Sequence, residues 1–180
     1  MTVVVLAGRR IDAPDAARPR FPLAHAERVR ERLRALFLER EAEVLLCSAA
    51  CGADLLALEV AGQLDMRRCI VLPFEPEHFR SASVTDRPGD WGAVFDRVLE
   101  ELEPHELRVL EPGQDETHVY DAVNLVLLDE ARALGVAMRR PALAVLVWEG
   151  SSRGAGDHSA SFREAARERH LEVVEVATLG

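Results

Sequence analysis

The sequence contains no lysine, so all 22 of its basic residues are arginines. This absence excludes chemistry that needs a lysine, including Schiff-base formation and a P-loop, whose lysine binds the β- and γ-phosphates. Isoleucine and asparagine are also scarce, which favours the codon bias of a GC-rich genome as the origin of the pattern. Any cationic chemistry therefore depends on guanidinium groups, whose planar shape suits carboxylate and phosphate.

Cysteine and histidine offer no convincing metal site. Cys47, Cys51 and Cys69 are odd in number and lack C-x-x-C spacing, which indicates reduced thiols rather than disulfides or zinc ligands. His118 lies near Asp115 and Glu116, but this cluster has no defined ligand spacing, so we interpret it as surface. We expect no metal and no cofactor.

Long apolar runs are missing too. No run reaches the roughly 18 residues that span a bilayer, and no basic region precedes the apolar segment 2–7, which argues against a signal peptide. These absences predict a cytoplasmic protein without a membrane partner. The net charge of −9 argues against nucleic acid as a partner, because non-specific binding to nucleic acid needs a basic surface.

What is present indicates one globular domain over residues 1–180, with 48% apolar and 29% charged residues. Short apolar runs alternate with amphipathic helical patterns, as expected for parallel strands that are covered on both faces. This alternation predicts an α/β fold, a three-layer α/β/α Rossmann-like sandwich with a mostly parallel sheet of about six strands. The expected strands are 3–7, 44–47, 69–72, 107–110, 143–148 and 173–177, and the segment 74–89 is expected to be a long polar loop or lid.

Ligands of open parallel sheets bind beyond the carboxyl ends of the strands, so the residues that follow each strand are the candidates. Glycine-rich turns after the second and fifth strands lead into helices, whose N-termini favour anions. Asp54 is more easily explained as a cap or as a partner of the loop backbone. Asn124 lies on an apolar helix face, so it either braces a loop or contacts ligand. The candidate ligand-binding residues are Gly8, Arg9, Arg10, Ser48, Gly52, Ala53, Asp54, Pro73, Arg80, Asn124, Glu149, Gly154, Gly156 and Ser159.

Several of these motifs resemble one known group. The loop 48–54 (S-A-A-C-G-A-D), the L-P-F segment at 72–74, and weaker matches at Gly8-Arg9-Arg10 and at 147–150 look like the SLOG superfamily, which includes the DprA/SMF and LOG-type Rossmann-like proteins. The resemblance covers nearly the whole chain. It implies a domain that binds a nucleotide or nucleotide-derived ligand as a sensor, with a homo-oligomer or an effector protein as further candidate partners.

The resemblance also implies an alternative function, because LOG-type members hydrolyse nucleoside monophosphates and release the base. Their catalytic motif, P-G-G-x-G-T-x-x-E, would match the stretch 154–162. Ser159 can replace the threonine, but Phe162 falls where the catalytic glutamate belongs, and the double glycine is broken. This departure favours ligand binding without efficient turnover over phosphoribohydrolase activity, and no catalytic residue can be assigned.

Overall fold

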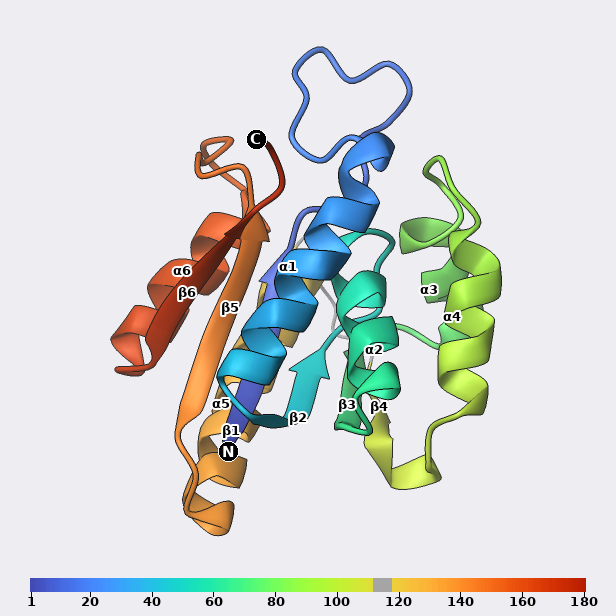
Figure 1. The fold of residues 1–180 in the computed structure, drawn as a ribbon. Coiled ribbons are helices and arrows are strands. Elements are labelled where there is room, and N and C mark those ends of the chain that lie inside the picture. The colour runs from blue at the N-terminus through green and yellow to red at the C-terminus, as the bar shows by residue number, and fades with distance from the viewer. Residues whose placement is uncertain (112–117) are drawn as a thin grey trace.

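The computed structural model describes residues 1–111 and 118–180, which form one six-stranded, all-parallel sheet with the order β4-β3-β2-β1-β5-β6. Helices alternate with the strands along the chain, which confirms the predicted α/β Rossmann-like fold (Figure 1). The strands are β1 (Thr2–Gly8), β2 (Ala42–Cys47), β3 (Arg67–Leu72), β4 (Leu107–Val109), β5 (Ala142–Trp148) and β6 (Glu172–Ala177).

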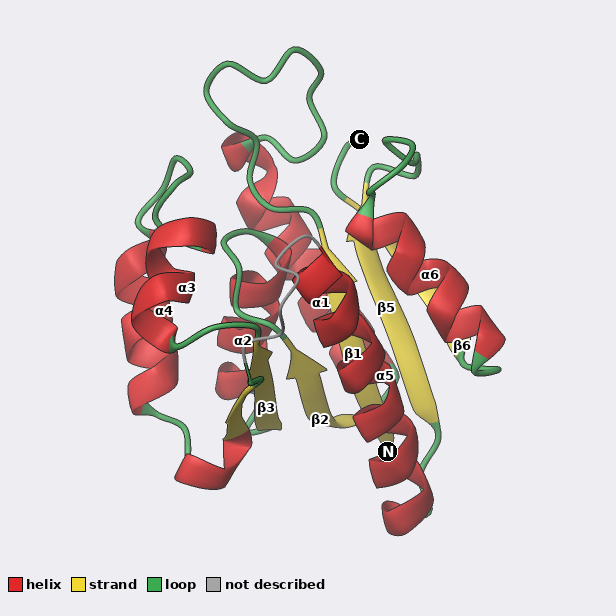
Figure 2. Ribbon diagram, turned by 180° about the vertical axis from the view of Figure 1, so that it is seen from behind, coloured by secondary structure: helices red, strands yellow, loops and turns green. Residues whose placement is uncertain are grey.

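Helices cover both faces of the sheet. On one face α1 packs on α2 and α2 packs on α4, while α5 and α6 pack together on the other face, as Figure 2 shows from behind. The helices are α1 (Ala26–Glu39), α2 (Ala53–Gln63), α3 (Pro76–Ser83), α4 (Trp91–Glu100), α5 (Val119–Met138) and α6 (His158–Glu168), with short 3-10 turns η1 (Leu23–His25) and η2 (Pro104–Glu106).

The central strand β1 explains why the sheet forms two cores. Residues 2–6 of β1 are all buried, and their alternating side chains enter opposite faces. Val4 and Leu6 belong to the core beneath α1 and α2, whereas Val3 and Val5 belong to the core beneath α5 and α6. A strand that is covered on both faces therefore needs the continuous run of valines seen in the sequence.

The segment 74–89 is not the long loop that the sequence predicts, because eight of its residues form α3. Pro76 stands in the first turn, where a missing N–H costs nothing. Phe79 and Ser83 are four residues apart on one face, and both are buried. The sequence did not indicate this helix, because Phe79 is its one buried aromatic residue and most of the residues around it are polar.

Asp90 occupies the N-cap of α4, but its side chain makes no capping hydrogen bond.

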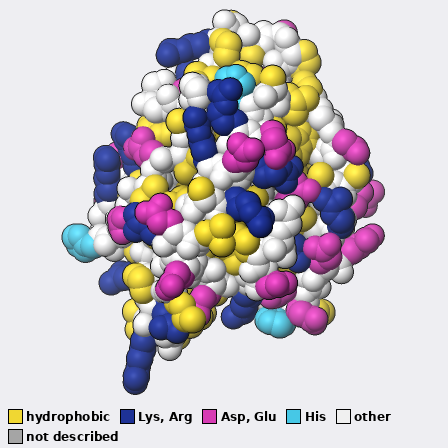
Figure 3. All heavy atoms as spheres, in the orientation of Figure 1, with side chains coloured by type: hydrophobic (Ala, Val, Ile, Leu, Met, Phe, Trp, Pro, Cys, Tyr) yellow, Lys and Arg dark blue, Asp and Glu magenta, His cyan; other side chains and the backbone are white. Residues whose placement is uncertain are grey.

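Arginines and carboxylates alternate over the face formed by α1, α2 and α4 (Figure 3). Glu59 of α2, for example, accepts from Arg30 of α1 at 2.8 Å and from Arg97 of α4 at 2.5 Å. Glu59 itself is partly buried between these helices, whereas the fully exposed pairs on this face contribute about 0–1 kcal/mol each. In the two described segments of the chain, no helix combines the length and the apolar character needed to cross a membrane.

Candidate functional site

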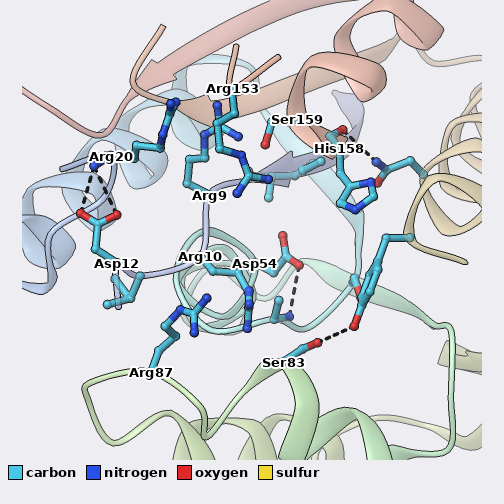
Figure 4. Close-up of a pocket in the computed structure, with 18 of the residues that line it drawn as sticks. Arg9, Arg10, Asp12, Arg20, Asp54, Ser83, Arg87, Arg153, His158 and Ser159 are labelled. Atoms are coloured by element: carbon cyan, nitrogen blue, oxygen red, sulfur yellow. Dashed lines mark hydrogen bonds between the residues drawn. The ribbon is translucent and has the colours of Figure 1, made fainter. Parts of the chain in front are cut away.

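A pocket of about 540 Å³ lies at the carboxyl ends of the strands, where the strand order reverses between β1 and β5 (Figure 4). At this switch point the connections leave in opposite directions, which opens a crevice in every sheet of this kind. Its volume is in the range of small-molecule sites. Half of the sequence candidates line the pocket, namely Gly8, Arg9, Arg10, Ser48, Asp54, Asn124 and Ser159.

Arg9 follows β1 and is 5% exposed. Its guanidinium donates to Glu149 at 2.7 and 3.2 Å, to Asp157 at 2.6 and 2.9 Å, and to the carbonyl oxygen of Ser151 at 2.8 Å. Nε and Nη1 each make one of these five bonds, and Nη2 makes three, so the two Nη2 hydrogens are shared among three acceptors. Arg9 thus ties the end of β1 to the loop after β5, and its Nε and Nη2 donors are engaged before any ligand arrives.

Asp157 occupies the N-cap of α6 and accepts from the backbone N–H of Ser159 (3.1 Å) and of Arg153 (2.7 Å) as well as from Arg9. Burial by itself would raise the pKa of Asp157, but the hydrogen bonds from Arg9 and from the Arg153 N–H outweigh it and hold the pKa well below its usual value. The N-terminus of α6 therefore already has an anion, which the protein itself supplies.

At the N-terminus of α2, too, a group of the chain itself accepts a hydrogen bond from a backbone N–H. The N–H of Ala53 donates to the carbonyl oxygen of Arg9 at 3.1 Å. Gly52 has φ +99°, and a Cβ there would meet that same oxygen at 2.8 Å. A Cβ on Gly8 would lie 2.6 Å from the Cβ of Ala53. Both glycines let the turns after β1 and β2 pack against each other. They are therefore needed for close packing of the backbone, rather than for the approach of a ligand.

The remaining candidates lie outside the pocket lining. Arg80 forms a bidentate pair with Asp96 of α4 at 2.8 Å. Glu149 is buried and held by Arg9 and Arg20. Gly52, Ala53, Pro73, Gly154 and Gly156 complete this group.

Four arginines that are not among the candidate residues also line the pocket, and these are Arg18, Arg20, Arg87 and Arg153. Arg87 shares the carboxylate of Asp86 with Arg10, at 3.0 and 2.8 Å. In the described part of the chain, the guanidinium group of Arg153 has only a 3.8 Å contact, with Asp157. Within the described residues Arg18 makes no hydrogen bond and no ion pair. The length of the connection 9–22 could have indicated Arg18 and Arg20 as candidates, because long connections in compact domains are often functional.

Asp54, in the first turn of α2, is 8% exposed, and its carboxyl group points into the middle of the pocket (Figure 4). In the described part of the chain it makes one hydrogen bond, from the N–H of Ala50 at 3.2 Å, as the sequence suggested for a partner of the loop backbone. Burial raises the pKa of Asp54 to about 7. A carboxyl group with such a pKa in a pocket is a feature of functional sites.

One wall of the pocket comes from the start of α5 and α6. The Nδ1 atom of His158 lies 2.8 Å from Asp121, and the hydroxyls of Tyr120 and Ser83 lie 2.9 Å apart. Asn124 of α5 donates to the carbonyl oxygen of His158 at 3.1 Å, which ties α5 to the first residue of α6, and Asn124 also lines the pocket.

No group of three or more metal-ligating side chains occurs among the residues that the structure describes. Asp115 and Glu116, which the sequence places near His118, lie outside these residues. Cys51 is buried, and burial raises the pKa of its thiol to about 11, which disfavours a nucleophilic thiolate.

The fold and the pocket define an α/β protein with a cavity at the switch point of its sheet. No protein-family model matches the chain, and no curated protein matches it significantly. Among solved structures, the X-ray structure of DNA processing protein A (DprA) from Streptococcus pneumoniae is similar, with a TM-score of 0.38 and 16% sequence identity. The match covers 96% of this chain and 58% of that chain, so this chain spans little more than half of that protein. A likeness of this degree carries no information about ligand or activity.

Proposed function

We propose that this chain binds a phosphate-bearing, nucleotide-like small molecule in the pocket between β1 and β5, as a SLOG-type sensor domain. The observation that carries the proposal is the concentration of six arginines around one cavity in a protein of net charge −9. Guanidinium groups are the preferred side chains for phosphate, because their donors match its oxygens in pairs.

The arginines have different duties in this proposal. Arg9 and Arg20 hold Glu149 and shape the site, so they are structural. Arg18 and Arg153 are exposed and largely without carboxylate partners, so they are available to a phosphate. Arg10 and Arg87 share one carboxylate, which leaves about one positive charge between them. The S-A-A-C-G-A-D loop contributes Ser48, Ala50 and Asp54 to the same cavity.

Thermal unfolding in the presence of nucleotides tests the proposal. The panel contains mono-, di- and cyclic nucleotides, NAD and ADP-ribose, because the base and the linkage are unspecified. A ligand at 100 times its Kd stabilises the folded protein by about 2.7 kcal/mol, which shifts the Tm by several degrees. A panel that leaves the Tm unchanged, with isothermal titration also silent, contradicts the proposal.

Phosphoribohydrolase activity is the second candidate, and Asp54 is the observation that favours it. Cleavage of an N-glycosidic bond needs a carboxyl group that stabilises positive charge or activates water, and Asp54 is the buried carboxyl group of this pocket. Against it, Phe162 stands at the glutamate position of the LOG-type motif and is fully buried in the core. Incubation with nucleoside monophosphates and chromatography for free base distinguishes the two functions, and release of base that Asp54→Asn abolishes would favour the hydrolase.

A further inference from the structure

The pocket has two parts with different chemistry. Its rim carries the exposed or half-buried guanidinium groups of Arg10, Arg18, Arg87 and Arg153. Its floor is formed by the ends of β1 and β2 and by the first turns of α2 and α6, where Asp54 and Ser159 are only 8% and 6% exposed. In the described residues no arginine forms an ion pair with Asp54. Arg9 also lines the pocket at the end of β1, but its charge is paired with Glu149 and Asp157, so the positive charge that is open to a ligand lies at the rim.

The floor has unused hydrogen-bonding capacity. An ionised carboxylate can accept about four hydrogen bonds, yet Asp54 accepts one, from Ala50. Among the residues that the structure describes, the buried hydroxyl oxygen of Ser48 has no hydrogen-bond partner, and Ser48 lines the same cavity. Buried polar groups without partners are rare in folded proteins because each costs free energy. The unpartnered hydroxyl of Ser48 and the spare acceptor capacity of Asp54 occur together on one cavity floor, which indicates that a ligand supplies their further partners.

The chemistry of the floor restricts the part of the ligand that fits there. A phosphate would meet the Asp54 carboxylate as a like charge at low dielectric, which is unfavourable. A neutral group with two adjacent donors, in contrast, can give both hydrogens to one carboxylate. A nucleotide offers such a pair in two places, the vicinal hydroxyls of its ribose and the N1–H and amino edge of guanine.

We propose that Asp54 and Ser48 form a subsite for a neutral pair of hydrogen-bond donors on the ligand, whose phosphate then lies outward at the arginine rim. This inference rests on the proposed nucleotide binding and adds the ligand's orientation. The carboxylate accepts both donors, and the Ser48 hydroxyl completes the set as donor or acceptor. Burial keeps the pKa of Asp54 near neutral in the empty pocket, and two donated hydrogen bonds would favour the ionised form.

Isothermal titration of four probes on the wild type and on Asp54→Asn tests the subsite. The probes are AMP, 2′,3′-dideoxy-AMP, GMP and IMP. The substitution keeps the size of the side chain and is expected to weaken binding at least tenfold for a probe that carries the donor pair. If the pair is the ribose diol, dideoxy-AMP binds the wild type at least tenfold more weakly than AMP and is insensitive to Asp54→Asn. If it is the guanine edge, GMP shows the loss and IMP, which lacks the amino group, shows less of it.

Two further variants complete the experiment: Ser48→Ala tests the second residue of the subsite, and Asp90→Asn is the control. Ser48→Ala removes the unpartnered hydroxyl, so it is expected to weaken binding several-fold without lowering the Tm of the empty protein. Asp90→Asn changes an exposed aspartate without a capping bond and is expected to bind as the wild type does. Equal affinity of wild type and Asp54→Asn for every probe that binds overturns the subsite and leaves the proposed function standing. If no probe binds the wild type, the subsite is overturned for nucleoside monophosphates, and the proposed function is decided separately by the wider nucleotide panel.

Discussion

The guanidinium group of Arg9 donates to both carboxylate oxygens of Asp157, at 2.6 and 2.9 Å, across 148 residues of sequence. The pair joins the end of β1 to the N-cap of α6, and Glu149 completes a buried ionic cluster with it. Desolvation of such a cluster is costly, so it adds less stability than its short distances suggest. Its clearest consequence is that the loops around the pocket are fixed before a ligand enters.

Replacing Arg9 tests this role. Arg9→Met leaves the carboxylates of Asp157 and Glu149 buried without their main partner, and we expect the free energy of unfolding in urea to fall by about 3–5 kcal/mol. Arg80→Met is the matched control, because Arg80 also forms a bidentate pair, with Asp96, but is 40% exposed. Loss of this exposed pair is expected to lower the free energy of unfolding far less than Arg9→Met does, because solvent screens the pair. Equal losses for the two variants would contradict the structural role of Arg9.

The carboxyl group of Asp54 makes stability depend on pH. Because burial raises its pKa from 3.8 to about 7, the folded state holds a proton that the unfolded state has already released. This contribution to stability is fully present below pH 3.8 and is lost as the pH rises through 7, by up to about 4 kcal/mol. Asp54→Asn is therefore expected to be more stable than the wild type at pH 8 and about equal at pH 4.

Thermal unfolding of both proteins between pH 4 and pH 8 provides the measurement. Asp90→Asn is the control for the loss of one carboxyl group, since its side chain is exposed. A difference between Asp54→Asn and the wild type that does not grow with pH would show that Asp54 titrates normally in the folded state.

Arginines of the rim are expected to affect ligand affinity rather than folding. Arg18→Gln and Arg153→Gln remove charges that have little or no carboxylate pairing, so the Tm of the empty protein should stay within about 2 °C of the wild type. The Kd of a nucleotide that binds is expected to rise five- to thirtyfold, and its dependence on salt to weaken. Arg132→Gln, on the exposed part of α5 outside the pocket, serves as the control.

Gly8 is expected to be sensitive to the smallest substitution. A Cβ there would lie 2.6 Å from both the Cβ of Ala53 and the carbonyl oxygen of Val147, and neither neighbour can move without shifting α2 or β5. We expect Gly8→Ala to lower the free energy of unfolding by about 1–3 kcal/mol. In Gly62→Ala the new atom meets only the flexible end of Arg68, and helix propensity favours alanine there, so stability is expected to stay equal or to rise.

The thiol of Cys51 is expected to be inert in the folded protein. Burial raises its pKa to about 11, so very little thiolate exists at pH 8. Reaction with a disulfide reagent at pH 8 should be slow in buffer and rapid for all three cysteines in guanidinium chloride. Fast modification of Cys51 without denaturant, located by peptide mass spectrometry, would show that the 48–54 loop opens in solution.

The sequence by itself determined the fold, because the periodicity of buried residues is a local property. The spacing of valines in β1 and of leucines in α2 is enough to predict a buried strand and a buried helix. The alternation of strands and helices along the chain then leaves few possible topologies. It also placed the pocket, since ligands of parallel sheets bind at the carboxyl ends of strands. The helix α3 was missed because a single aromatic, Phe79, anchors it among polar residues.

Only the tertiary structure decided which side chains are free to act. In the sequence, Arg9 and Arg18 are equally good candidates for binding phosphate. In the structure, Arg9 is paired with two buried carboxylates from the C-terminal part of the chain, whereas Arg18 has no partner in the described residues. The N-termini of α2 and α6, which the sequence suggested as anion sites, are satisfied by Arg9's carbonyl oxygen and by Asp157. Hydrogen-bond saturation depends on contacts between distant residues, and local patterns do not record it.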